Sequence, residues 1–214
     1  MPELDHFMYA VSSLEDGIAW AQEIFQVTPD LGGAHPGQGT QNALISLGDT
    51  YLEIIAPDPN QSLEGNLGGR LTQLAAPGLV TWVLRGDLEA IRTQCAPHPL
   101  KMIGPLHTQR QTPGAQLLQW QLLFARNAQF SGCMPFFIDW LACPHPSRTN
   151  VVGGEFISLD VFHPQAAAIN AVMSDIDAPI TVQSGEARLQ LNIKTRLGNQ
   201  VVQSNPNTLG LTFG

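Results

Sequence analysis

The stretch HPGQGTQNALISLGDTYLEIIAPDPN, residues 35–60, holds two runs typical of β-strands, NALISLG (42–48) and YLEIIAP (51–57). A Gly-Asp pair between them predicts a turn. The second run is apolar except for one carboxylate, Glu53, near its centre. A buried carboxylate is costly unless it is paired, protonated or bound to a metal. The partner of Glu53 is therefore the first question that this sequence raises.

The residues before this stretch complete one structural unit. LDHFMYAV (4–11) predicts a buried strand. SSLEDGIAWAQEIF (12–25) predicts a helix, because Ser12 or Ser13 can cap it and its apolar residues recur on one helical face. A Gly- and Pro-rich segment then leads to the two strands. The resulting order is one strand, one helix and up to three further strands.

This pattern returns twice along the chain, and an internal repeat is the strongest structural signal in the sequence. We expect a first βαβββ module at 1–60, a second at 75–147 that pairs with the first, and a divergent third at 150–214. One module cannot bury both faces of its small sheet, so modules must pair. The expected fold class is α+β: repeated βαβββ modules form an open, cupped mixed sheet with helices on the convex side. The third module must pair with the others, dimerise or form a separate layer.

Composition excludes several classes of protein. The chain has 214 residues, 43% hydrophobic and 13% charged, which is typical of a globular protein. A net charge of −8, with ten Lys and Arg spread along the chain, does not favour nucleic-acid binding. The three cysteines show neither a disulfide framework nor a zinc motif. No apolar run is long enough for a membrane helix, so we expect a cytoplasmic protein without a membrane partner.

The period-two alternation of strands predicts where Glu53 points. His6 and Met8 share one side of the first strand, and Glu53 shares a side of its own strand with Tyr51 and Ile55. The opposite, apolar sides suit packing under the helix, which leaves His6 and Glu53 facing the cleft together. An imidazole and a carboxylate from two strands can ligate a divalent transition metal. A direct hydrogen bond between them would satisfy both groups equally well.

Repeated βαβββ units with a histidine in the first strand and a glutamate in the fourth resemble the vicinal oxygen chelate superfamily. More closely, LDHFMYAV (4–11), the 35–59 segment, RQTPGAQLLQWQL (110–122) and PFFIDW (135–140) resemble its glyoxalase-like domain group. The resemblance covers about residues 1–150, and the 35–59 segment is its most specific part.

The resemblance implies metal ligands on the first and fourth strands of two modules. His6 and Glu53 match in the first module, and Asp139 lies near the glutamate position in the second. The first strand of the second module, LVTWVL (79–84), lacks the expected His or Gln. The implied cofactor is a divalent transition metal (Zn, Ni, Mn or Fe) held by His6, Glu53 and Asp139, or completed by His107 or His145. A site without metal stays open, and no nucleotide cofactor is indicated.

Several polar side chains are candidates for substrate binding. Arg110 could clamp a carboxylate or phosphate. The other candidates are Asn42, Gln119, Gln121, His35 and His145. For each of them a plain structural role is the alternative: a turn or strand hydrogen bond for Asn42, an exposed sheet face for the glutamines, and a loop position for the histidines, which precede proline.

The resemblance implies a glyoxalase-like small-molecule enzyme. A bound metal would chelate two neighbouring oxygens of the substrate and stabilise an enediolate-like or oxyanion intermediate, with Glu53 as a ligand and as a base. Lyase, isomerase and dioxygenase chemistry are all open, because a fold does not determine a reaction. The alternatives are a non-catalytic protein that sequesters a small molecule in the cup, and an interaction protein that forms a homodimer through strand edges.

Overall fold

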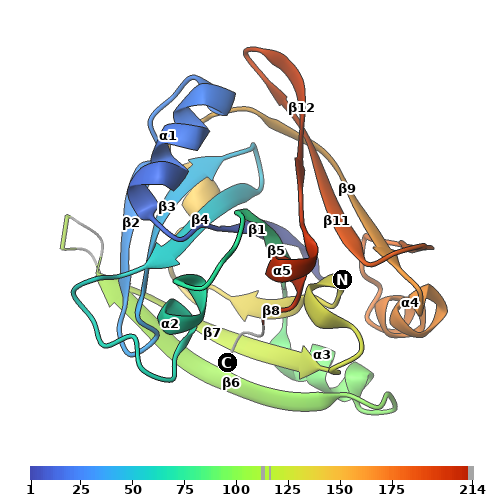
Figure 1. Ribbon diagram of the computed structural model, residues 1–214. Helices are drawn as coiled ribbons and strands as arrows, with labels where there is room; N and C mark the ends of the chain where they lie inside the picture. Colours follow the sequence, from blue (N-terminus) through green and yellow to red (C-terminus); the bar gives the residue numbers. More distant parts are fainter. Residues whose placement is uncertain (112–113, 116, 212–214) are drawn as a thin grey trace.

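The computed structural model describes residues 1–111, 114–115 and 117–211 (Figure 1). The first stretch of the chain forms β1 (Glu3–Ala10), α1 (Leu14–Phe25), β2 (Asp30–His35), β3 (Thr40–Ser46) and β4 (Tyr51–Pro57). The connection that follows contains α2 (Leu67–Leu71). The second stretch forms β5 (Gly78–Arg85), α3 (Leu88–Cys95), β6 (Lys101–Gln111), β7 (Leu117–Arg126), η1 (Ser131–Cys133), β8 (Phe136–Asp139) and η2 (Pro146–Arg148).

Helix α1 begins where the sequence predicts a cap. The side chain of Ser13 accepts a hydrogen bond from the backbone N–H of Asp16, and Gln26 ends the helix in a left-handed conformation. Gly17, Ala21 and Phe25 form its buried face. This face packs on the convex side of the sheet, so the opposite side of the sheet stays free to form a cup.

Eight strands form one curved mixed sheet in the order β2-β3-β4-β1-β5-β8-β7-β6. The two four-strand halves meet where β1 and β5 pair antiparallel, and within each half the first and last strands run parallel. The sheet curls into a half-barrel, which confirms the expected α+β fold class. The edge strands β2 and β6 approach each other at Gly33, because a Cβ atom there would lie 2.7 Å from the carbonyl oxygen of Gln111.

The third stretch forms β9 (Glu155–His163), α4 (Ala166–Asp175), β10 (Val182–Ser184), β11 (Arg188–Thr195), β12 (Gly198–Gln203) and α5 (Pro206–Leu209). Its strands make a separate sheet in the order β10-β9-β11-β12 (Figure 1). β9, the first strand of this stretch, lies inside its sheet, whereas β1 lies at one edge of the first half of the large sheet. Val161, Leu189 and Ile193 join one core with Phe7 and Trp82, so this sheet is a layer on the convex side of the half-barrel.

Two β-bulges interrupt the first half of the large sheet. On β1, Leu4 pairs with Leu84 and His6 with Val83, so Asp5 is an extra residue. On β2, Leu31 pairs with Ala43 and Gly33 with Asn42, so Gly32 is another. A bulge re-aims side chains without ending the ladder, and both bulges lie beside the cup. In the described ranges, the structure contains no helix with the length and apolar character needed to cross a membrane.

Candidate active site

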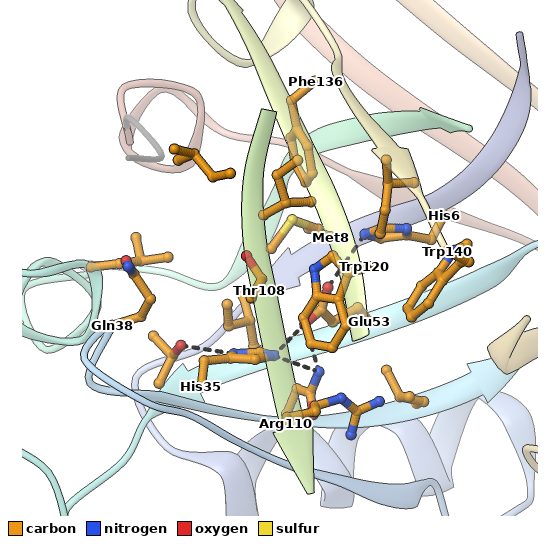
Figure 2. Close-up of a pocket in the computed structure, with 18 of the residues that line it drawn as sticks. His6, Met8, His35, Gln38, Glu53, Thr108, Arg110, Trp120, Phe136 and Trp140 are labelled. Atoms are coloured by element: carbon orange, nitrogen blue, oxygen red, sulfur yellow. Dashed lines mark hydrogen bonds and ion pairs between the residues drawn. The ribbon is translucent and has the colours of Figure 1, made fainter. Parts of the chain in front are cut away.

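The concave face of the half-barrel encloses a cavity of about 160 Å³. Polar and apolar side chains line different parts of it (Figure 2). Polar side chains come from β1 to β4 and from β6: His6, His35, Gln38, Thr40, Asn42, Tyr51, Glu53, Thr108 and Arg110. The wall from β7 and β8 is apolar: Trp120, Leu122, Phe124, Phe136, Ile138 and Trp140.

His6 and Glu53 lie together at the polar end of the cup. The Nε2 atom of His6 is 3.4 Å from Oε2 of Glu53, and both side chains are almost fully buried. The pairing of β1 with β4 places Met8 opposite Glu53 and His6 opposite Tyr51, so the imidazole and the carboxylate project from the same face. The ring of Tyr51 stacks on His6 with centroids 4.6 Å apart. The carboxylate in the apolar strand therefore has an imidazole partner.

Asp5 holds the other side of the His6 ring. His6 Nδ1 donates to Asp5 Oδ1 at 2.5 Å, while Trp140 Nε1 and His145 Nε2 donate to Asp5 Oδ2 at 2.9 and 3.0 Å. Asp5 is completely buried. Strict alternation would turn Asp5 away from His6, so the sequence analysis missed it; the bulge brings the two side chains together. A charged residue inside an otherwise buried strand was the available signal.

These contacts set the protonation of the cluster. Burial alone would lower the pKa of His6, but its hydrogen bonds to Asp5 and Glu53 raise it to about 9. Burial alone would raise the pKa of Glu53, but the hydrogen bond and charge of His6, with help from His35 and Asn42, lower it to about 2. The hydrogen bonds from His145 and His6 likewise hold the pKa of Asp5 well below its usual range, against the effect of burial. At neutral pH the cluster is an imidazolium between two carboxylates.

We expect the contribution of the His6–Glu53 pair to the free energy of unfolding to be greatest between about pH 4.5 and 6.5. The raised pKa of His6 gives stability that is complete below about 6.5 and lost as pH rises towards 9. The lowered pKa of Glu53 gives stability that is complete above 4.5 and lost as pH falls towards 2. The alkaline loss should be on the order of 3 kcal/mol. Urea unfolding at a series of pH values measures it, and equal stability at pH 6 and pH 9 would contradict the charged pair.

Asn42 and His35 complete the polar end of the cavity. Asn42 Nδ2 donates to Glu53 Oε1 at 2.6 Å and lies 3.4 Å from His35 Nε2. The Nδ1 atom of His35 is 2.9 Å from the Thr40 hydroxyl. Burial lowers the pKa of His35, more than the charge of Glu53 raises it. His35 is therefore a neutral ring, and the amide of Asn42 fixes the orientation of the carboxylate.

Arg110 reaches the same cavity from β6, and only 5% of it is exposed. Its Nη1 atom is buried and has no hydrogen-bond partner in the described part of the chain, and the same holds for Asn42 Oδ1. Burial lowers the pKa of Arg110, while the negative charge of Glu53 raises it. The guanidinium of Arg110 thus interacts with the charge of Glu53 at a distance and not through a direct hydrogen bond.

Gly32, the bulge residue of β2, makes room for these two side chains. A Cβ atom there would lie 2.1 Å from Asn42 Oδ1 and 2.7 Å from Arg110 Nη1. We expect Gly32→Ala to cost about 1–3 kcal/mol as an overpacking change and to displace both side-chain ends. The side-chain amide resonances of Asn42 should move in a ¹⁵N–¹H spectrum. Gly185→Ala is the matched control, because its nearest neighbour would be at 3.5 Å; unmoved Asn42 resonances in the Gly32 variant would refute this role.

The structure does not bring the remaining candidates to the cavity. Asp139 lies between Ile138 and Trp140, which do line it, and its Oδ1 instead accepts from the backbone N–H of Leu141. Asp139 therefore does not join His6 and Glu53 as a third ligand. His145 supports Asp5 from behind, so it does not contact a ligand in the cup directly.

Gln119 and Gln121 also face away from the cup, because the apolar side of β7 lines it. Gln119 bonds to Gln109, and Gln121 to His107, across the outer face of β6 and β7. The expectation that the two glutamines enter the cup is wrong, and the exposed sheet face is correct. His107 is excluded from the site for the same reason.

The chain belongs to the glyoxalase-like domain family, whose model matches residues 4–176. No curated protein sequence matches the chain.

Solved structures share the fold at low identity. A hypothetical protein from Staphylococcus aureus aligns with a TM-score of 0.65 and 20% identity, over 95% of this chain and 85% of that one. Methylmalonyl-CoA epimerase from Mycobacterium tuberculosis aligns with a TM-score of 0.47 and 17% identity, over 64% and 85%. A variant of the Streptomyces coelicolor methylmalonyl-CoA epimerase in complex with 2-nitronate-propionyl-CoA gives 0.49 and 14%, over 67% and 98%.

The vicinal oxygen chelate superfamily, which the sequence resembles, often uses divalent metals, so the donor set of the cup has to be tested. A transition metal held by protein needs three or more suitable ligands. The described residues contain no group of three His, Cys, Asp or Glu side chains suited to one. In the second half, β8 presents Phe136 and Ile138 to the cup, and the amide of Asn42 directs its N–H at Glu53. The side chains present do not fit a resident metal.

Proposed function

We propose that this chain is a small-molecule enzyme of the lyase or isomerase type, which moves a proton in a carbonyl compound without a resident metal. The observation that carries the proposal is one carboxylate, Glu53, between two cations inside the cup (Figure 2). The cations are the imidazolium of His6 and the guanidinium of Arg110. Preorganised donors in a water-poor site stabilise a developing oxyanion strongly.

The proposed step is an enolisation. Glu53 takes a proton from the carbon next to a carbonyl group; the electron pair of that C–H bond forms a C=C bond to the carbonyl carbon, and the π pair of the carbonyl moves to its oxygen. The Nε2–H of His6 and an N–H of Arg110 then donate hydrogen bonds to this oxygen. Return of the proton to another position completes an isomerisation, and loss of a leaving group from the adjacent carbon completes an elimination.

Substrate binding would also activate Glu53. In the empty cup the hydrogen bond from His6 is the main cause that lowers the pKa of Glu53, and burial opposes it. A carbonyl oxygen that accepts the Nε2–H of His6 removes this hydrogen bond but leaves the carboxylate buried. The pKa of Glu53 then rises, so the carboxylate becomes a stronger base when it is needed.

Deuterium exchange tests the reaction without knowledge of the natural substrate. The purified protein is incubated in D₂O with a panel of small 2-oxo acids, 2-hydroxy ketones and 1,2-dicarbonyl compounds. Loss of the C–H signal next to the carbonyl is followed by NMR. We expect faster exchange than the uncatalysed rate for at least one compound, with no effect of a metal chelator. Exchange that stops on chelation would overturn the metal-free mechanism.

Sequestration of a small molecule is the second candidate, and the apolar wall of β7 and β8 favours it. A sequestering protein would bind compounds from the panel without catalysing exchange of any of them. The two candidates therefore give opposite results with the same ligands.

A further inference from the structure

We infer that the cup takes a compound with a single aromatic ring and one carboxylate, and that Arg110 binds this carboxylate. On the proposed function, the carboxylate lies next to the reacting carbonyl, so the substrate class is the aryl 2-oxo acids. The inference that the ligand has a ring and a carboxylate depends only on the side chains that line the cavity.

The carboxylate is inferred from the state of Arg110. Its guanidinium lines the cavity, is 5% exposed, and makes no hydrogen bond or ion pair with the residues that the structure describes. A buried charge is costly while it lacks a partner. The planar fork of a guanidinium matches a carboxylate, with two parallel hydrogen bonds. A ligand carboxylate would supply the partner that the chain does not.

The charged side chains around the cavity suit a ligand with one negative charge. Two cations, His6 and Arg110, line the cavity together with one anion, Glu53, while His35 is neutral. Asp5 lies behind His6 and does not reach the cavity. Asp5 and Glu53 flank His6, so Arg110 is the cation that lacks a contact anion among the residues that the structure describes, and one carboxylate supplies that anion. A phosphate dianion would leave an uncompensated charge in a buried site.

The aromatic ring is inferred from the opposite wall. Trp120 and Trp140 have ring centroids 5.5 Å apart, and Phe124 and Phe136 lie 5.1 Å apart. All four side chains line the cavity. Aromatic side chains favour offset or edge contacts with another ring. A volume of about 160 Å³ is close to that of an apolar cavity known to hold one benzene ring, so the space suits a single ring.

The two features are placed so that one small molecule can reach both. On the paired strands β6 and β7, Arg110 is opposite Leu118, and Thr108 is opposite Trp120. Arg110 and Thr108 point to the same face, because they are two residues apart, and both line the cavity. Arg110 is therefore the diagonal neighbour of Trp120 on the face that lines the cavity, and both are labelled in Figure 2. A ligand whose ring packs on Trp120 can thus place its carboxylate at Arg110.

Calorimetric titration of the full chain with phenylpyruvate tests the inference. The comparison ligands are pyruvate, which lacks the ring, phenylpyruvamide, which lacks the charge, and phenyl phosphate. Phenylpyruvate should bind about 10- to 100-fold more tightly than pyruvate and phenylpyruvamide. Equal affinity for the amide would overturn the carboxylate, equal affinity for pyruvate would overturn the ring, and tighter binding of phenyl phosphate would overturn the monoanion.

Arg110→Met assigns the effect to one residue. It should lower affinity for phenylpyruvate about 10- to 100-fold and leave that for phenylpyruvamide unchanged. Arg188→Met, on the separate sheet, is the control and should change neither. An equal loss for both ligands would overturn the role of Arg110. Tight binding of phenylpyruvate without deuterium exchange would reject the proposed enzyme and support the ligand class. Exchange confined to compounds without a ring would support the enzyme and reject the ligand class.

Discussion

Replacing Glu53 with glutamine is expected to slow enzyme-catalysed deuterium exchange by about 10²- to 10⁴-fold, the usual contribution of a general base. Glutamine keeps the size of the side chain and can still accept the hydrogen bond from Asn42. It cannot accept a proton from carbon. Affinity for phenylpyruvate should stay equal or increase, because the substitution removes the one negative charge that lines the cup.

The exchange rate at saturating substrate and the calorimetric affinity separate these two effects. Glu155→Gln is the matched control, because Glu155 lies on a strand of the outer sheet with an exposed side chain. It should leave rate and affinity at their wild-type values. A Glu53→Gln protein that retains more than a tenth of the wild-type exchange rate would show that another group removes the proton.

Asp5→Ala is expected to lower the free energy of unfolding by about 3–5 kcal/mol, the cost of removing one partner from a buried ion pair. The change leaves the imidazolium of His6 without its closest anion. It also leaves Trp140 Nε1 and His145 Nε2 without the oxygen that accepts from them. Asp5→Asn should cost less, because an amide oxygen can still accept one of these hydrogen bonds.

Urea unfolding at pH 6 measures both Asp5 variants against Asp49→Ala. Asp49 is exposed in the turn before β4, so its loss should change stability by less than about 0.5 kcal/mol. An Asp5→Ala protein as stable as the Asp49 variant would mean that the buried cluster contributes nothing to folding. The alkaline loss of stability should also shrink in Asp5→Ala, because Asp5 helps to raise the pKa of His6.

The repeated order of elements was predictable because hydrophobic periodicity is local. The same alternation identified the face shared by Met8, Glu53 and Ile55, since β4 pairs without interruption. It failed at Asp5, where a bulge adds one residue and turns Leu4 to the convex core. No residue type in this strand indicates that a bulge occurs at Asp5. The strand order of the outer sheet was equally hidden, because it depends on pairings between distant segments.

The orientation of the side chains on β7 was not predictable from alternation, for a different reason. We expected the apolar side of each strand to lie under a helix and the polar side to face the cleft. On β7 the larger apolar side chains face the cavity, while Leu123 and Ala125 meet the convex core. Gln119 and Gln121 project to the outer face. Alternation separates two faces but does not say which one is concave.

The separation of the ionised residues from the aromatic wall along the chain has a consequence for how this protein can diversify. The ionised cluster comes mainly from one continuous stretch, β1 to β4, and the aromatic wall from another, β7 and β8. Substitutions at Trp120, Leu122 or Ile138 can reshape the wall while the Asp5–His6–Glu53 contacts stay in place. Relatives with the same ionised cluster and a different wall are then expected to process other compounds by the same step. A gene segment for β7 and β8, which leaves Arg110 on β6 in place, is accordingly the natural unit to exchange when a new substrate range is sought.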